Sequence, residues 1–160
     1  MNLNVTPRTM ALLFPVVLVA YLATFYGCER WRAHNGPWEV AFTTNALGQP
    51  MMRAAQTSLH LSNVQIAFAG ESFTNAPETV RFDRVLRPVP FGKVIFEDLT
   101  ALPGVITLDL FGHEIELLPR VLIVNKKEVP WQSGLSLVLS ATNKPAIPPK
   151  PPKPRKGLSR

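Results

Sequence analysis

An uncharged apolar stretch near the N-terminus constrains this chain more than any other feature. Residues 10–28 read MALLFPVVLVAYLATFYGC and contain no charged side chain. At about 1.5 Å per residue, a helix of this length spans roughly 28 Å, close to the ~30 Å hydrocarbon core of a bilayer. We therefore expect residues 10–28 to form a single uncleaved transmembrane anchor behind a short tail, residues 1–9. The side chains expected to contact lipid are Met10, Leu13, Phe14, Val17, Leu18, Tyr21, Leu22 and Phe25.

Three other interpretations fit this segment less well. A buried helix of a soluble protein is usually shorter and carries a polar stripe. A cleaved signal peptide needs small residues at positions −3 and −1, but the pairs Tyr21/Ala23 and Phe25/Gly27 each place an aromatic ring there. A lipoprotein signal would make Cys28 the lipidated residue, although the aromatic residues before it depart from the small-residue pattern. Lipidation of Cys28 stays open as an alternative.

The orientation of the anchor is nearly balanced by charge. Arg8 and the terminal amine precede the apolar run, and Arg30 and Arg32 follow it, so the positive-inside rule gives close to a tie. A short N-terminal tail before an apolar run is typical of a signal-anchor whose N-terminus stays in the cytoplasm. On that basis we expect the following domain to lie outside the cytoplasm.

The rest of the chain divides by charge into a near-neutral domain and a basic tail. Residues 29–143 contain ten Lys or Arg and eleven Asp or Glu, whereas residues 144–160 contain six basic residues, six prolines and no acid. A nucleic-acid-binding domain gathers basic side chains on one folded face, so the folded domain is not expected to bind nucleic acid. The tail is predicted to be disordered and extended. Its candidate contacts to an anionic partner are Lys144, Lys150, Lys153, Arg155, Lys156 and Arg160.

Between the anchor and the tail, the pattern predicts a juxtamembrane linker at residues 29–37 and a mainly β domain at residues 38–143. Alternating apolar and polar residues indicate short strands, beginning around Trp38, Leu59, Val80, Lys93, Val105, Glu114, Val121, Glu128 and Ser136. Prolines fall between these runs, where they do not interrupt a central strand. We expect an antiparallel sandwich or a small barrel. Residues 51–59 are the one short helix expected in this domain.

Two turns are expected to close β-hairpins. Phe111 and Gly112 separate the runs 105–110 and 114–118, and residues 125–127 separate the runs 121–124 and 128–131. Tight turns with residues that tolerate a positive φ are typical of such hairpins.

The sequence offers little catalytic chemistry. Cys28 is the sole cysteine, so no disulfide within the chain and no multi-cysteine metal site is possible. His34 lies in the expected linker, His60 is expected to face solvent, and His113 is expected in a turn beside the solvated Glu114 and Glu116. No nucleophile elbow, phosphate-binding glycine loop or metal-spaced histidine pair occurs. We expect no cofactor and no bound metal.

Arginines at positions 81, 84 and 87 form a further group. In an extended chain, Arg81 and Arg87 share one side, and we expect ordinary solvated arginines that pair with Asp83 or Glu78.

These observations favour a non-enzymatic, membrane-tethered β-domain that serves as a structural, accessory or protein-interaction subunit. Its expected partners are the lipid bilayer and another protein. The main alternative is a module that binds an envelope polymer or a small ligand, with the basic tail on an anionic surface. An anchored hydrolase is a third hypothesis, which would require buried titratable groups around one pocket.

Overall fold

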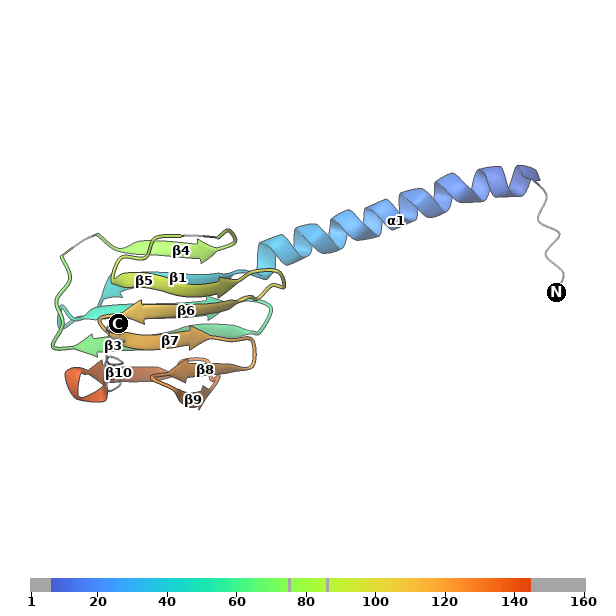
Figure 1. Ribbon diagram of the computed structural model, residues 1–160. Coiled ribbons are helices and arrows are strands. Elements are labelled where there is room, and N and C mark those ends of the chain that lie inside the picture. The colour runs from blue at the N-terminus through green and yellow to red at the C-terminus, as the bar shows by residue number, and fades with distance from the viewer. Residues whose placement is uncertain (1–6, 75, 86, 145–160) are drawn as a thin grey trace, which may run out of the picture.

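One long helix projects from a domain made of two β-sheets (Figure 1). The computed structural model describes residues 7–74, 76–85 and 87–144. Helix α1 (Pro7–Asn35) contains Pro15 and ends two residues before the first strand of the domain. Most of the segment expected as a linker, residues 29–37, is therefore helical rather than irregular.

Each sheet has five strands. The first sheet contains, in spatial order, β10 (Ser136–Ser140), β3 (Leu61–Ala69), β2 (Pro50–Gln56), β1 (Trp38–Thr44) and β4 (Glu78–Phe82). The second contains β5 (Gly92–Asp98), β6 (Val105–Leu110), β7 (His113–Leu117), β8 (Val121–Val124) and β9 (Lys127–Pro130). All neighbours are antiparallel except β10, which pairs in parallel with β3. A short 3₁₀ helix, η1 (Ala141–Asn143), follows β10.

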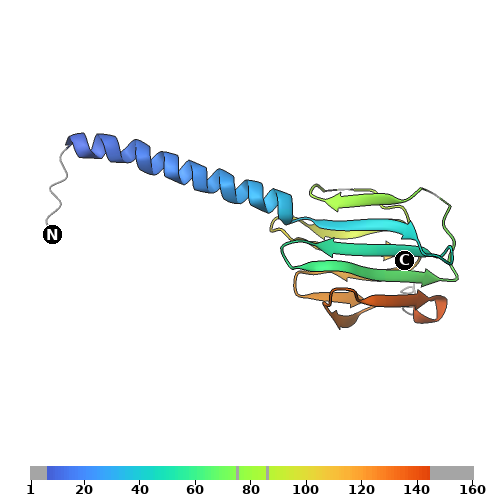
Figure 2. The same ribbon diagram turned by 180° about the vertical axis from the view of Figure 1, so that it is seen from behind.

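The two sheets lie face to face with a single apolar core between them (Figure 2). The first sheet contributes large buried side chains such as Phe42 and Phe68, and the second contributes Leu108 and Ile115. Successive side chains of a strand alternate between faces, which explains why these residues recur at every second position. The prediction of a mainly β domain with an apolar helix before it is thus confirmed at the level of two mostly antiparallel sheets.

The strand pairing shows which turns and strand ends lie at each of the two ends of the sandwich. Trp38, the first residue of β1, pairs with Phe82, the last residue of β4, and the Trp38 indole contacts the loop before β6 through Gly104. Helix α1 therefore joins one end of the sandwich, here called the near end. The turns at residues 45–49, 111–112 and 125–126 lie at the opposite, far end, together with Lys144.

The prediction of a short helix at residues 51–59 is wrong, because most of this segment belongs to strand β2. The β2 side chains at Met52, Ala54 and Gln56 are buried, whereas Arg53 is exposed. Methionine, alanine, arginine and glutamine all favour helices. Here pairing with β1 on one side and β3 on the other outweighs that preference, because the alternate burial of a strand matches this segment.

Both expected hairpins are confirmed. Phe111 and Gly112 have φ values of 52° and 78°, and Asn125 and Lys126 have values of 51° and 67°. Each pair forms a two-residue connection between antiparallel strands. Positive φ at both positions gives the turn a twist that matches the strands it joins.

Candidate functional site at the helix–sandwich junction

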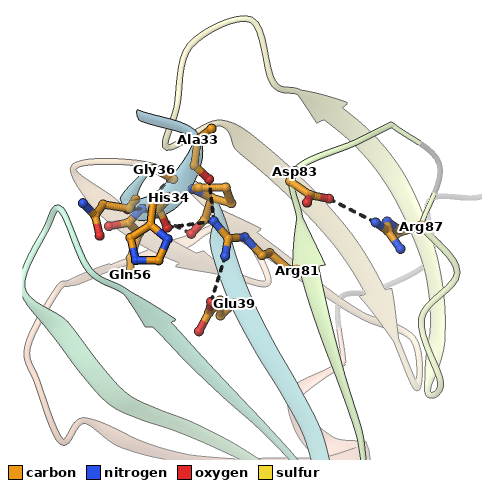
Figure 3. A network of polar contacts seen from close by, with 10 residues as sticks. Ala33, His34, Gly36, Glu39, Gln56, Arg81, Asp83 and Arg87 are labelled. Atoms are coloured by element: carbon orange, nitrogen blue, oxygen red, sulfur yellow. Dashed lines mark hydrogen bonds and ion pairs between the residues drawn. The ribbon is translucent and has the colours of Figure 1, made fainter. Parts of the chain in front are cut away.

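The end of helix α1 is held by a guanidinium from the sandwich. Arg81, on β4, donates through Nη2 to the carbonyl oxygens of Ala33 and His34, the latter at 2.7 Å (Figure 3). Its Nη1 lies 3.7 Å from the carboxylate of Glu39 on the neighbouring strand. The last carbonyls of a helix lack partners within the helix and carry partial negative charge. The side chain of Arg81 therefore caps the helix C-terminus.

A second cap comes from the buried amide of Gln56, the last residue of β2. Its Nε2 lies 3.0 Å from the carbonyl oxygen of Asn35 and also contacts the carbonyl oxygens of Gly36 and Pro37 (Figure 3). The other half of the amide accepts from the backbone of Leu59 at 3.0 Å. One side chain thus joins the end of the helix to the turn between β2 and β3.

Gly36 is required by the close approach at this point. A Cβ at this position would lie 2.4 Å from the carbonyl oxygen of Arg32 and 2.6 Å from the Cβ of Leu102. The Gly36 amide donates to the same Arg32 oxygen at 2.7 Å and closes the last helical turn. Only a glycine lets the helix turn into β1 against the β5–β6 loop without displacing backbone.

The β5–β6 loop contacts the helix from the other side. Arg32 donates through Nη1 to the carbonyl oxygen of Thr100 at 3.3 Å and pairs through Nη2 with Glu29 at 2.9 Å. Thr100 is fixed in turn by Asp98, whose carboxylate accepts from the Thr100 hydroxyl at 2.7 Å and from its backbone amide at 3.0 Å. These two hydrogen bonds lower the pKa of Asp98. Contacts on both sides therefore fix the direction of the helix relative to the sandwich.

A hollow of about 760 Å³ opens in the angle between the helix and the end of β4. The helix lines it with Gly27, Arg30, Trp31 and His34, which lie on one helix face by their spacing. The sandwich contributes Arg81 and Asp83. Asp83 is paired with Arg87 at 3.1 Å, whereas Arg30 is exposed and makes no ion pair with any residue that the structure describes.

The far end of the sandwich contains a buried histidine, His113, whose position was predicted incorrectly from the sequence. His113 is the first residue of β7 and is 1% exposed, so the expectation of a solvated turn histidine is wrong. Its Nδ1 lies 3.0 Å from the amide of Asn125, and its ring lies beside Phe68. Burial is the main reason that its pKa is lowered, and the nearby Lys144 lowers it further. The imidazole belongs to the core, while Glu114 and Glu116 point away from it.

A smaller groove of about 440 Å³ lies between the β8–β9 hairpin and β10. Apolar side chains, among them Val129 and Leu137, form its walls, and Lys127 and Lys144 lie among the lining residues. Lys144 is also paired with Glu71 at 3.0 Å. The described chain ends at this groove.

The structure separates the residues predicted to be functional. The eight predicted anchor residues are exposed along α1, and no part of the apolar window is buried against the domain. His60 is exposed, as expected, and Arg87 pairs with Asp83. Of the six tail residues, Lys144 is described, and Lys150, Lys153, Arg155, Lys156 and Arg160 lie outside the described residues.

The capping roles of Arg81 and Gln56 were missed by the sequence analysis. Each side chain is far in sequence from the carbonyls it contacts, and no local pattern marks such a pairing. The nearest signal was Arg81 itself, which had been expected to be solvated and paired with Asp83 or Glu78.

Metal-binding side chains are spread apart in the part of the chain that the structure describes. Within the described ranges, no three His, Cys, Asp or Glu side chains are placed to hold a metal ion. Helix α1 is long and apolar enough to cross a membrane. No protein-family model matches the chain, and no curated protein or solved structure matches it significantly.

Proposed function

We propose that this protein is a non-enzymatic, single-pass membrane subunit that presents a β-sandwich to a protein partner at a fixed orientation above the bilayer. The observation that carries the proposal is the capped junction, where Arg81 and Gln56 hold the last carbonyls of an exposed apolar helix. For a domain that needs only to be tethered to the membrane, a flexible linker would be sufficient. Here the end of the helix and the start of β1 are joined within two residues.

The exposed helix supports insertion into a bilayer. Side chains such as Leu12, Phe14 and Tyr26 are 71%, 71% and 67% exposed in the isolated chain. Exposed apolar surface of this extent is unfavourable in water and marks a membrane or protein contact. The charges on the two sides of the apolar run are nearly balanced, and the short N-terminal tail before that run supports a sandwich outside the cytoplasm. A reporter fused after residue 160 tests that side directly.

Crosslinking in the native membrane tests the proposed role. Mild crosslinking followed by detergent extraction and affinity purification of the full chain is expected to recover one partner at a stoichiometric ratio. The variant that tests the junction is Gln56→Leu, which keeps the anchor and removes one cap of the helix. The yield of crosslinked partner from Gln56→Leu is expected to fall below that from the wild-type protein. Recovery of no stoichiometric partner from the wild-type protein would contradict the proposal.

A second candidate function rests on the groove between the β8–β9 hairpin and β10. Its apolar walls and two lysines suit an elongated ligand that carries negative charge, such as an anionic envelope polymer. The sequence after Lys144 contains five further basic residues.

Truncation separates the contribution of the groove from that of the tail. Removing residues 145–160 retains Lys144 and its contact with Glu71. Salt-sensitive binding to an anionic polymer that survives this truncation assigns the ligand to the groove. Binding that disappears assigns it to the tail, and the absence of binding by the full chain rejects this second function.

A further inference from the structure

The hollow at the helix–sandwich junction lies at the depth of lipid headgroups if the apolar helix spans the bilayer. Arg30 and Trp31 follow the last residue of the apolar run by two and three positions, which is about 3 to 5 Å along the helix. The headgroup layer on each side of a bilayer is roughly 5 to 7 Å thick. Both residues would then lie within that layer, and Gly27 would lie at its inner boundary.

The side chains around the hollow combine an aromatic ring with basic groups. Trp31 is 61% exposed, and indole rings favour the membrane interface. Arg30 is exposed without an ion pair in the described chain, while Asp83, the acid of the hollow, is already paired with Arg87. Arginine donates in a planar fork that matches phosphate oxygens.

Arg30 lines a hollow with two walls, one from the helix and one from the sandwich, and is not an isolated arginine on a flat surface. The face formed by Gly27, Arg30, Trp31 and His34 is turned towards the end of β4, so a group in the hollow contacts helix and sandwich together. Gly27 leaves the inner end open, because a Cβ there would meet no atom within 4 Å. The fixed angle of the helix keeps the two walls apart.

We propose that this hollow binds the phosphate headgroup of an anionic phospholipid, with Arg30 as the main phosphate contact and Trp31 packing beside the glycerol backbone. The inference rests on the proposed membrane anchor, which places the hollow in the headgroup layer. A lipid bound there would contact the domain as well as the anchor and would stabilise their relative orientation.

Lipid titration of the detergent-solubilised full chain, read by native mass spectrometry, tests this site. The probes are phosphatidylglycerol and phosphatidylcholine. Phosphatidylglycerol is expected to bind on the order of tenfold more tightly, and Arg30→Gln is expected to remove that preference. Arg30→Lys keeps the charge without the fork and is expected to retain part of it. Arg120→Gln is the matched control, because Arg120 is exposed in the β7–β8 loop at the same end of the sandwich.

Each remaining outcome counts against the inference. Equal losses in Arg30→Gln and Arg120→Gln would show general attraction to positive charge instead of a site. Displacement of the lipid by soluble glycerol phosphate at similar concentrations would assign the hollow to a free phosphate compound. Equal binding of both lipids by a protein that stays in carbonate-washed membranes would reject this site alone, whereas release of the protein by carbonate would reject the membrane anchor itself.

Discussion

The side-chain amide of Gln56 lies 3.0 Å from the carbonyl oxygen of Asn35, so the last residue of β2 holds the last residue of helix α1. The same amide reaches the next two carbonyls of the chain. Buried carbonyls left without a donor are costly, so this single side chain favours one direction of the chain as it leaves the helix. The junction is fixed by hydrogen bonds that a flexible linker would not have.

Replacing Gln56 with leucine is expected to loosen this junction. Gln56→Leu leaves the carbonyls of Gly36 and Pro37 without their side-chain donor, at a cost of about 1–3 kcal/mol in folding stability. Spin labels at the native Cys28 and at an introduced Lys126→Cys are expected to give a narrow distance distribution in the parent and a broad one in Gln56→Leu. Gln65→Leu is the control, because the Gln65 side-chain amide donates to Asn63, two residues away, and makes no hydrogen bond to helix α1 in the described chain. Equal widths for all three proteins would show that the Gln56 amide does not fix the helix.

Gly36→Ala probes the close approach at the same point. The added methyl group would overlap the Arg32 carbonyl and Leu102, which is expected to destabilise the fold by about 1–3 kcal/mol. Gly27→Ala, which meets no atom within 4 Å, is expected to be neutral or slightly stabilising. Thermal unfolding of both variants in the same detergent distinguishes them. A Gly36→Ala protein as stable as the parent would show that the β5–β6 loop can shift to accommodate the methyl group at little cost in stability.

The sequence predicted features that depend on neighbours in the chain and missed those that depend on distant contacts. The apolar helix, the alternating strands and the turns at Gly112 and Lys126 follow from local patterns. Strand β2 does not, because its helix-favouring residues become a strand only between β1 and β3. The caps at Arg81 and Gln56 pair residues about 20 to 48 positions apart, and no periodicity encodes such a pairing.

The buried histidine predicts a pH dependence of stability. The pKa of His113 is lowered from its ordinary value of 6.5 in the folded protein, so the unfolded chain binds a proton more readily. Its contribution to stability is complete above pH 6.5 and declines as the pH falls below that value, until the folded-state pKa is passed. Melting temperatures measured between pH 8 and pH 5 are expected to fall less in His113→Gln than in the parent. The exposed His60→Gln variant is expected to retain the parental slope; if it loses that slope as fully as His113→Gln does, His113 is not the source.

Core packing between the sheets gives a further test of the sandwich. Leu108 is 0% exposed, and truncating it to alanine is expected to cost about 2–5 kcal/mol. Val138 on the edge strand β10 is 61% exposed, and Val138→Ala is expected to change stability by less than about 0.5 kcal/mol. Chemical denaturation of the full chain in detergent measures both. Similar costs at the two positions would contradict the face-to-face arrangement of the sheets.

The proposed anchor predicts resistance to extraction from membranes. The parent protein is expected to remain with the membrane fraction in alkaline carbonate and to be released by detergent. Leu18→Arg, near the middle of the apolar run, adds about 2.5–3.5 kcal/mol to the cost of insertion and is expected to increase the released fraction. Leu47→Arg, in an exposed turn of the sandwich, serves as the control. Release of the intact parent without detergent would contradict the anchor.

The described chain ends at Lys144, at the far end of the sandwich, while the helix enters at the near end. Strand β3, with nine residues, gives the sandwich a length of about 30 Å. Because the connection between helix and sandwich is fixed, the sandwich turns together with the helix when the helix tilts. A tilt of about 20°, common for helices in bilayers, would swing the tip sideways by roughly 10 Å at that length. A small change in bilayer thickness would then become a large sideways displacement of Lys144, where the described chain ends.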